Sequence, residues 1–293
     1  LETAQKEGFK IIAAAETHIH ADYLSGAREL VNRCDATLYV SDEGDHNWKY
    51  EYLDGLKSCL LTDRSEFKIG LIEFEVMHTP GHTPESISFI LTDRGGGSSE
   101  PMGIFTGDFV FVGDIGRPDL LEKAAGIKDT AEDGAKHMFN SVQRFKALPD
   151  FMQVWPAHGA GSACGKSLGA VPMSTVGYEK LNNWAFRIDD ENEFTKLLLT
   201  GQPEPPKYFA MMKKLNKIGP ALLNEGDTPE LRDVTALETY GSETILLDTR
   251  DSQDFAKGHY QGAINIPFNK SFTNWAGWLI GYDLDILLLT STK

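Results

Sequence analysis

The stretch Thr17-His18-Ile19-His20-Ala21-Asp22-Tyr23 places two imidazoles and one carboxylate within five residues. It follows the apolar run Ile11 to Ala15, which has the length and composition of a short buried strand. The pattern from Leu24 to Val31 is helical, so the histidines are predicted to lie on a loop between a strand and a helix. This position is typical of metal ligands, although a His-x-His pair taken alone is also common on protein surfaces.

Three further loops carry metal-ligand residue types at the ends of predicted strands. A strand of alternating polarity runs into His78-Thr79-Pro80-Gly81-His82-Thr83-Pro84, whose prolines and glycine restrict the backbone and hold a ligand at little ordering cost. Two more strands end in Gly107-Asp108 and in Pro156-Ala157-His158-Gly159. An aspartate beside a glycine is most often a turn former. The recurrence of the arrangement nevertheless predicts one metal centre, and its candidate residues are His18, His20, Asp22, His82, Asp108 and His158.

The charge balance restricts the partners of the chain. Its 293 residues contain 28 Lys and Arg against 43 Asp and Glu, which gives a net charge of -15. Binding to nucleic acid or to acidic membranes needs a basic face, so neither partner is expected. An anionic substrate would need local cationic residues that act against this field. The length is sufficient for one large or two medium domains, and we expect two.

The sequence features that bear on cellular location predict the cytoplasm. No apolar run approaches the length that spans a membrane, and the first residues lack the pattern of a signal peptide. The three cysteines, Cys34, Cys59 and Cys164, have no framework spacing, which indicates a reducing compartment rather than a disulfide scaffold. We therefore predict a cytoplasmic protein, and we expect it to form a homo-oligomer.

The order of these motifs resembles that of the metallo-β-lactamase superfamily, which implies an α/β fold, the αββα sandwich, with a metal at its edge. The superfamily motif usually reads His-x-His-x-Asp-His, and its last histidine helps to hold a second metal. Tyr23 stands at that position here. A phenol with an ordinary pKa of about 10 is a poor ligand for a divalent ion at neutral pH, so we expect one metal rather than two.

Within the superfamily, the chain most resembles the persulfide dioxygenases. The resemblance implies that His18, His82 and Asp108 hold one Fe(II) per chain. Two histidines and one carboxylate that leave positions open are typical of non-haem iron oxygenases, whereas zinc in a tetrahedral site is the competing expectation. The implied reaction, part of sulfide detoxification, oxidises the persulfide of a small thiol such as glutathione or coenzyme A with O2 to sulfite and thiol. Which thiol carries the persulfide stays open.

Two other functions are the alternatives. A zinc-dependent thioester hydrolase of the glyoxalase II kind shares the fold and most ligands, but Tyr23 argues against it because that chemistry depends on two metals. A non-catalytic sulfur carrier or docking protein is the second alternative. In the dioxygenase interpretation, His20, Asp22 and His158 orient the ligands and accept protons near the substrate, with Tyr23 beside them.

Two loops carry further candidate residues. Arg117 lies in Gly113-Asp114-Ile115-Gly116-Arg117-Pro118-Asp119, where the resemblance implies an arginine that binds a substrate carboxylate or phosphate. The alternative is an ion pair with one of the two aspartates in that stretch. The stretch Gly159 to Lys166 resembles a loop of dioxygenases fused to rhodanese modules, which implies that Cys164 receives or passes sulfur and that Lys166 binds substrate or lowers the thiol pKa. The alternative for Cys164 is a small buried thiol.

The chain is predicted to divide into residues 1–220, a linker at 221–229, and residues 230–293. The first part lacks the leading strands of the superfamily. The last part resembles a doubly wound α/β rhodanese-like domain, because Gly258-His259-Tyr260-Gln261-Gly262-Ala263-Ile264-Asn265-Ile266-Pro267 matches the signature of that family. Thr290 falls where the family has its catalytic cysteine, and a hydroxyl is a far weaker nucleophile, so this partial domain is expected to be inactive. Whether an active rhodanese domain follows residue 293 stays open.

Overall fold

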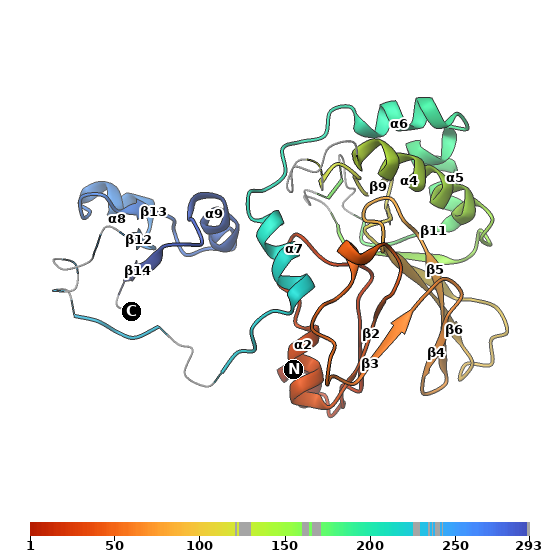
Figure 1. Cartoon of the computed structure of the whole chain (residues 1–293), viewed down its shortest axis with the longest axis horizontal. Helices are drawn as coiled ribbons and strands as arrows, with labels where there is room; N and C mark the ends of the chain where they lie inside the picture. Colours follow the sequence, from red (N-terminus) through yellow and green to blue (C-terminus); the bar gives the residue numbers. More distant parts are fainter. Residues whose placement is uncertain are drawn as a thin grey trace. The chain divides into compact units, whose positions relative to one another are not determined.

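The structure is a computed structural model that describes residues 1–120, 122, 130–159, 164–165, 171–224, 229–233, 235, 237, 241 and 243–291. It forms two compact units (Figure 1). The main unit comprises Leu1–Pro205 with Phe209–Leu222, and the C-terminal unit comprises Pro206–Tyr208 with Leu223–Lys293. The predicted boundary at residue 220 lies close to this division.

The described residues of the main unit form two large sheets and one short hairpin. The first is parallel, in the order β1-β2-β3: β1 (Ala13–Ala15), β2 (Thr37–Ser41) and β3 (Ser58–Leu61). The second has the order β11-β10-β7-β6-β5-β4: β4 (Glu66–Ile69), β5 (Ile72–His78), β6 (Ile87–Asp93), β7 (Gly103–Gly107), β10 (Gln153–Pro156) and β11 (Ser174–Thr175). Its strands are antiparallel to their neighbours except β10 and β7, which are parallel. A short hairpin joins β8 (Val110–Phe111) to β9 (Asp114–Ile115).

Helices and short 3-10 turns complete the main unit, and Figure 1 shows α4, α5 and α6 gathered on one side of it. Their bounds are α1 (Glu2–Lys6), α2 (Ala27–Cys34), η1 (His46–Trp48), α4 (Thr130–Lys146), α5 (Val176–Asn182), η2 (Trp184–Arg187), α6 (Glu191–Leu199) and α7 (Phe209–Ile218). No helix in the described ranges is both long enough and apolar enough to cross a membrane. None of the three cysteines, all of which are described, forms a disulfide bond.

Three apolar clusters separate the layers of the main unit. One joins α2 to the first sheet through Val31 and Leu38. A second lies between the two sheets, where Leu61 meets Phe67 and its neighbours. The largest packs α4 and α6 onto the second sheet and includes Ile104 and Val154. The order is therefore helix, sheet, sheet, helix, and the predicted αββα sandwich is confirmed.

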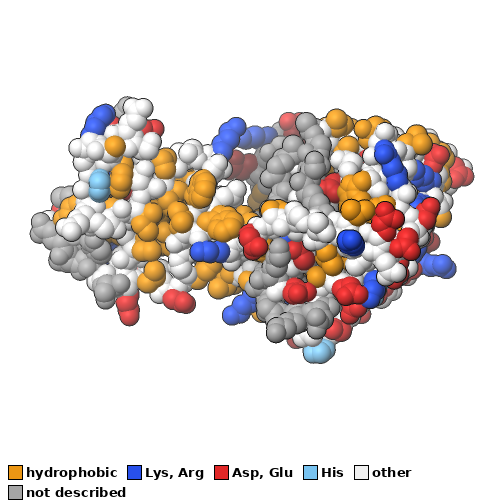
Figure 2. All heavy atoms as spheres, turned by 90° about the horizontal axis from the view of Figure 1, so that it is seen from above, with side chains coloured by type: hydrophobic (Ala, Val, Ile, Leu, Met, Phe, Trp, Pro, Cys, Tyr) orange, Lys and Arg blue, Asp and Glu red, His pale blue; other side chains and the backbone are white. Residues whose placement is uncertain are grey.

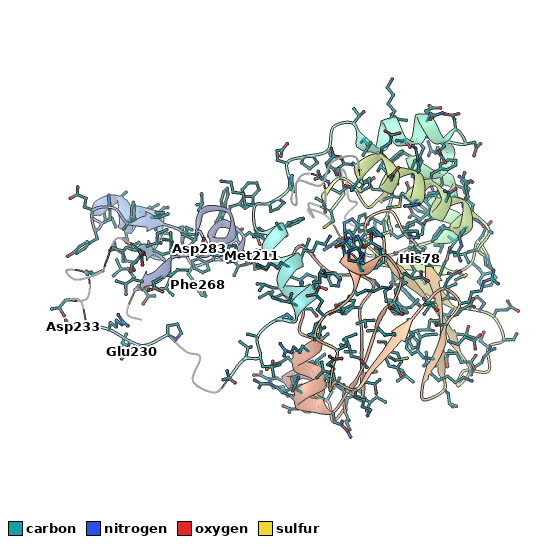
Figure 3. The ribbon with its side chains drawn as sticks, viewed as in Figure 1. His78, Met211, Glu230, Asp233, Phe268 and Asp283 are labelled. Atoms are coloured by element: carbon teal, nitrogen blue, oxygen red, sulfur yellow. The ribbon has the colours of Figure 1, made fainter. Side chains whose placement is uncertain are left out.

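The described residues of the C-terminal unit form a parallel sheet in the order β13-β12-β14 and the helices α8 and α9. The bounds in chain order are β12 (Thr244–Asp248), α8 (Ser252–Lys257), β13 (Ile264–Asn265), α9 (Phe272–Leu279) and β14 (Asp285–Leu289). The Arg250 guanidinium donates to both carboxylate oxygens of Asp248. Nδ1 of His259 lies 2.9 Å from the carbonyl oxygen of Phe255, within hydrogen-bond distance. Hydrophobic side chains reach the surface of this unit, including Phe268, which is 79% exposed (Figures 2 and 3). The rhodanese-like assignment of residues 230–293 stays a prediction.

Candidate metal centre

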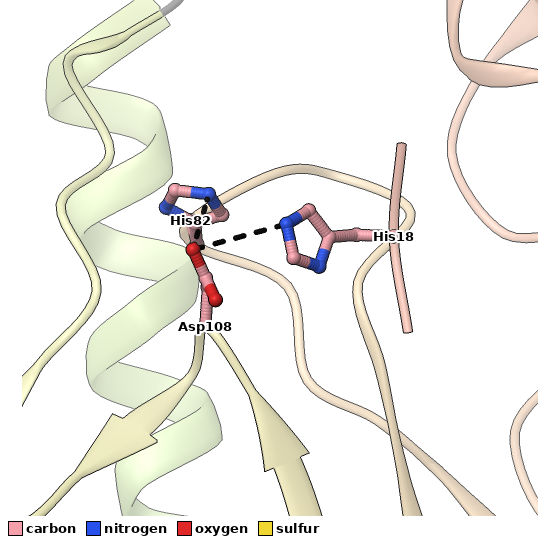
Figure 4. Close-up of side chains that lie close together, drawn as sticks. All are labelled: His18, His82 and Asp108. Atoms are coloured by element: carbon pink, nitrogen blue, oxygen red, sulfur yellow. Dashed lines mark ion pairs between the residues drawn. The ribbon is translucent and has the colours of Figure 1, made fainter. Parts of the chain in front are cut away.

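Three buried side chains from separate loops meet at the edge of the main unit's sheets. His18 follows β1, His82 lies on the loop between β5 and β6, and Asp108 directly follows β7. One ligand atom from each lies within 4.8 Å of the other two. The Nε2 atoms of His18 and His82 are 3.9 Å and 3.4 Å from Oδ2 of Asp108, and Figure 4 shows the three side chains pointing toward one another.

The donor atoms of this group fit a divalent metal ion. Nδ1 of His82 lies 2.9 Å from the carbonyl oxygen of Arg117, and Nδ1 of His18 lies 2.9 Å from Oγ1 of Thr17, so both Nε2 atoms are free to face the carboxylate. Both carboxylate oxygens of Asp108 are buried, and neither accepts a hydrogen bond from the residues that the structure describes. A buried carboxylate without hydrogen bonds is costly, and a cation between the three side chains would compensate that cost.

The electrostatics of the group favour the protonation states that bind metal. Burial lowers the pKa of His18 and His82 below the ordinary value, so both imidazoles are neutral at pH 7. Burial alone would raise the pKa of Asp108, but its contacts with His158, His18 and His82 outweigh burial and lower it. Neutral imidazoles and an ionised carboxylate are the forms that coordinate a cation.

Glycines allow the ligand loops to approach one another. Gly107 has a φ of +54°, and a Cβ at this position would lie 2.5 Å from Oγ1 of Thr17. A Cβ on Gly116 would lie 1.8 Å from the carbonyl oxygen of Asp108. Neither position accepts a larger residue without movement of the backbone that carries a ligand. His78 closes the base of the His82 loop, because its Nε2 is 2.9 Å from the carbonyl oxygen of Pro84 (Figure 3).

A second group of possible ligands lies beside the first and consists of Asp22, His158 and Cys164. Their ligand atoms also lie within 4.8 Å of one another. Nε2 of His158 is 3.2 Å from Oδ2 of Asp22 and 3.3 Å from Oδ1 of Asp108, so this imidazole lies between the two groups. Burial, together with the charge of Asp108, raises the pKa of Asp22 to about 6. Cys164 is only 1% exposed, and sequence reasoning did not place its thiol with these two residues.

His20 and Tyr23 lie next to His18 and belong to neither group. The ring of His20 is 4.3 Å from that of His18 and 4.5 Å from that of Tyr23, measured between centroids. Nδ1 of His20 is buried without a hydrogen-bond partner among the described residues. Partial burial and the nearby carboxylates of Glu16 and Asp22 raise the pKa of Tyr23 above its ordinary value. The phenol is therefore an even poorer metal ligand than its ordinary pKa suggests.

For Arg117 the structure favours the ion-pair alternative, and substrate binding by this residue stays a prediction. Its side chain has no exposed surface, and Nε and Nη2 each donate a 2.7 Å hydrogen bond to the carboxylate of Asp119. A guanidinium enclosed in this way is not presented to a substrate, so the ion pair is the interpretation that the structure supports. The backbone of Arg117 contributes the carbonyl that orients His82. Lys166, the other predicted substrate-binding residue, lies outside the described residues.

Two buried residues support the first histidine loop without having been predicted. Oε1 of Glu85 accepts a 2.9 Å hydrogen bond from the backbone N–H of Ile19, which lies between the two histidines. The Asn216 side chain, on α7, donates to the carbonyls of His20 and Tyr23 at 2.8 and 2.7 Å. Glu85 lies directly after the second histidine loop, and this position could have identified it from the sequence as a supporting residue. Nothing in the sequence identifies Asn216 in this way, because its partners are almost 200 residues away along the chain.

The fold and the geometry define an α/β protein in which histidines and carboxylates form a buried site that could hold a metal ion. The sequence profile described as "Metallo-beta-lactamase superfamily" matches residues 1–158, and the chain belongs to this superfamily. A crystal structure of a metallo-beta-lactamase from Staphylococcus aureus has a TM-score of 0.87 and 47% identity, and it covers 98% of this chain and 80% of that chain.

Among the curated relatives, two kinds of enzyme bear on the chemistry of this site. The mitochondrial persulfide dioxygenase ETHE1 of Bos taurus is 25% identical over 209 residues, which are 68% of this chain and 68% of the relative. Glyoxylase B2 of Dictyostelium discoideum is 27% identical over 195 residues, which are 62% of this chain and 60% of the relative. Relatives of both kinds match at similar identity, so the comparisons indicate a metal-dependent enzyme without choosing between the two chemistries.

Proposed function

We propose that the chain is a non-haem iron persulfide dioxygenase. The observation that carries the proposal is the buried group of His18, His82 and Asp108, in which two Nε2 atoms face a carboxylate that accepts no hydrogen bond from any described residue. Two imidazoles and one carboxylate are the ligand set of non-haem iron oxygenases, which keep coordination positions open for substrate and O2. The similarity to the mitochondrial persulfide dioxygenase of Bos taurus supports the same assignment.

The reaction converts R-S-SH, O2 and water into R-SH, sulfite and two protons. Bound iron would supply the redox chemistry between O2 and the outer persulfide sulfur. The chain's own residues hold and orient the ligands, through the carbonyl of Arg117 on His82 and the hydroxyl of Thr17 on His18. In this proposal, His158 and Asp22, which lie 3.2 Å apart beside the ligand group, take up the protons that the reaction releases.

Metal analysis combined with O2 uptake tests this proposal. Protein purified without O2 should contain iron, and it should consume O2 when glutathione persulfide or coenzyme A persulfide is added. His18→Ala should lose both properties because it removes one of three ligands. His46→Ala is the matched control, since this histidine is exposed and lies outside both ligand groups. Stoichiometric zinc and no O2 uptake with either persulfide would refute the proposal.

A zinc-dependent thioester hydrolase is the second candidate, and the group of Asp22, His158 and Cys164 is the observation that favours it. This group offers three ligand atoms for a second ion, even though Tyr23 occupies the position of the usual histidine. The similarity to Glyoxylase B2 points the same way. Two metal ions per chain with turnover of a glutathione thioester would support this function. A single ion with no thioester turnover would exclude it.

We also propose that residues 230–293 are an inactive, rhodanese-like module. The parallel sheet of the C-terminal unit supports this assignment, as does the pairing of Arg250 with Asp248 at the end of β12. Thr290 follows β14, which is where a sulfurtransferase would need its thiolate. Thiosulfate:cyanide sulfurtransferase activity should therefore be absent, and Thr290→Cys is the variant that tests whether only the nucleophile is missing.

A further inference from the structure

We propose that Lys213 on α7 is a nucleophilic amine that captures uncharged aldehydes as an imine in the cavity beside the metal-ligand group. This covalent site is separate from the metal ligands, and it does not depend on which reaction the metal supports. Three observations carry the inference: the place of Lys213 in the cavity wall, the aromatic ring against its amino group, and the apolar lining around it.

The cavity has a volume of about 530 Å³ and lies within the main unit. Lys213 lines it, and so does His82, a member of the metal-ligand group. The Lys213 side chain is half-buried, whereas that of Lys214, its neighbour on the same helix, is exposed. A small organic molecule fits a cavity of this size, and it would contact the Lys213 side chain there.

The amino group of Lys213 lies against an aromatic face rather than beside a carboxylate. Its Nζ is 3.2 Å from the centroid of the Trp48 ring. Among the described residues, no carboxylate oxygen lies within 4.0 Å of this nitrogen. Lys217, one turn further along α7, instead has its Nζ 2.8 Å from a carboxylate oxygen of Glu51. The charged form of Lys213 therefore lacks the close counter-ion that Lys217 has.

The surroundings of Lys213 favour the unprotonated amine. Burial lowers the pKa of Lys213 to about 7, compared with about 10.4 for an ordinary lysine. The negative charge of Glu85 acts in the opposite direction, and the positive charge of Lys217 adds to the effect of burial. Roughly half of the Lys213 side chains are therefore unprotonated at pH 7, and a lysine that has lost its water in this way is an activated nucleophile.

The lining of the cavity suits an uncharged ligand. The other titratable side chains that line it are of both signs: Asp45, His82, Asp133, His137, Lys214 and Lys217. Because Lys217 is paired with Glu51, this wall has no excess of positive charge that would select an anion. Apolar side chains cover much of the remaining wall, among them Trp48, Pro84, Leu120 and Phe209. A short alkyl chain would bury its surface against them, which favours an aliphatic aldehyde.

The reaction of an amine with an aldehyde needs neither a cofactor nor an oxidant. The lone pair of the unprotonated Nζ adds to the carbonyl carbon, and a C=N bond then replaces the C=O bond. The carbonyl oxygen leaves as water and takes both protons of the amine. Cyanoborohydride delivers hydride to the imine and converts it into a stable secondary amine, so the captured aldehyde stays attached to the lysine that bound it.

Reductive labelling of the metal-loaded protein with butanal and cyanoborohydride, read by peptide mass spectrometry, tests the inference. At pH 7, Lys213 should be labelled at least about tenfold faster than Lys196, an exposed lysine on α6 outside the cavity. Lys213→Arg should abolish labelling at this position, since a guanidinium keeps the charge but forms no imine under these conditions. Lys214→Arg is the matched control, and it should leave the labelling of Lys213 unchanged.

The pH dependence distinguishes an activated amine from a lysine that is merely accessible. With Nα-acetyl-lysine amide in the same solution, the ratio of Lys213 labelling to labelling of this compound should fall at least about tenfold from pH 7 to pH 9, because only the free compound is still gaining unprotonated amine. Glu85→Gln should increase labelling of Lys213 at pH 6, because it removes the negative charge that favours the ammonium form. Labelling of Lys213 no faster than that of Lys196 at pH 7, or a constant ratio to the free compound, would overturn the inference whatever metal and activity the protein has.

Discussion

Replacement of Arg117 by glutamine should destabilise the main unit strongly. The guanidinium is fully buried and donates two 2.7 Å hydrogen bonds to Asp119, so Arg117→Gln leaves a buried carboxylate without its cation. Removal of one partner from a buried ion pair typically costs ~3–5 kcal/mol. For a unit of this size, that loss corresponds to a fall of roughly 6–20 °C in the melting temperature.

The assay is urea unfolding of the metal-free protein, because bound metal would add its own stabilisation. Asp119→Asn should lower the free energy of unfolding by a similar amount. Since the two side chains contact each other, the double variant should lose clearly less free energy of unfolding than the sum of the two single variants. Lys136→Gln breaks an exposed pair with Glu132 and serves as the control, because a solvent-screened pair should change the stability little. A stability of Arg117→Gln within about 1 kcal/mol of wild type, together with a raised KM for persulfide, would show that the guanidinium binds substrate after all.

Three further predictions follow from the site. Gly81→Ala should destabilise by ~1–3 kcal/mol in urea unfolding, because φ is +149° and the added Cβ would lie 2.6 Å from Cβ of Met138. Gly159→Ala should change the stability little, because a Cβ there would have no described atom within 4 Å. Burial lowers the pKa of His20 to about 4, so between pH 6.5 and pH 4 this imidazole is protonated in the unfolded state but not in the folded state. Over this range the free energy of unfolding of wild type should therefore fall by up to ~3 kcal/mol more than that of His20→Gln. If the two proteins lose stability in parallel over this range, the buried neutral imidazole is not the cause. Asp108→Asn should weaken metal binding by more than the roughly 10–100-fold typical of a supporting residue, measured by competition with a chelator, and unchanged affinity would exclude this carboxylate as a ligand.

The ligand loops could be predicted because each combines a local strand pattern with a ligand residue at the strand's end. His18, His82 and Asp108 come together because β1, the β5–β6 loop and β7 meet at one edge of the sandwich. The contacts that hold these loops could not be predicted in the same way. The choice of Asp119 as the partner of Arg117 depends on burial, which a loop rich in glycine and proline does not reveal.

The sequence also predicts the ends of helices only approximately. The helical pattern was predicted from Leu24, but α2 begins at Ala27. The hydroxyl of Ser25 donates to Glu16 and accepts a hydrogen bond from the N–H of Ala27, while its own N–H bonds to Asn216. These contacts hold the preceding residues in the ligand loop and delay the first helical turn. Hydrophobic periodicity does not detect such contacts, because they are made by polar groups, one of which lies on α7.

Consumption of O2 by iron-loaded and zinc-loaded protein is the most direct test of the central claim. With a supplied thiol persulfide, the iron-loaded protein should consume about one O2 for each persulfide and release one sulfite, as the balance of the reaction requires. The zinc-loaded protein should bind the same thiol and consume no O2, because zinc has no redox chemistry. Hydrolysis of a thioester by the zinc form, with no O2 uptake by the iron form, would contradict the account and assign the site to the hydrolases.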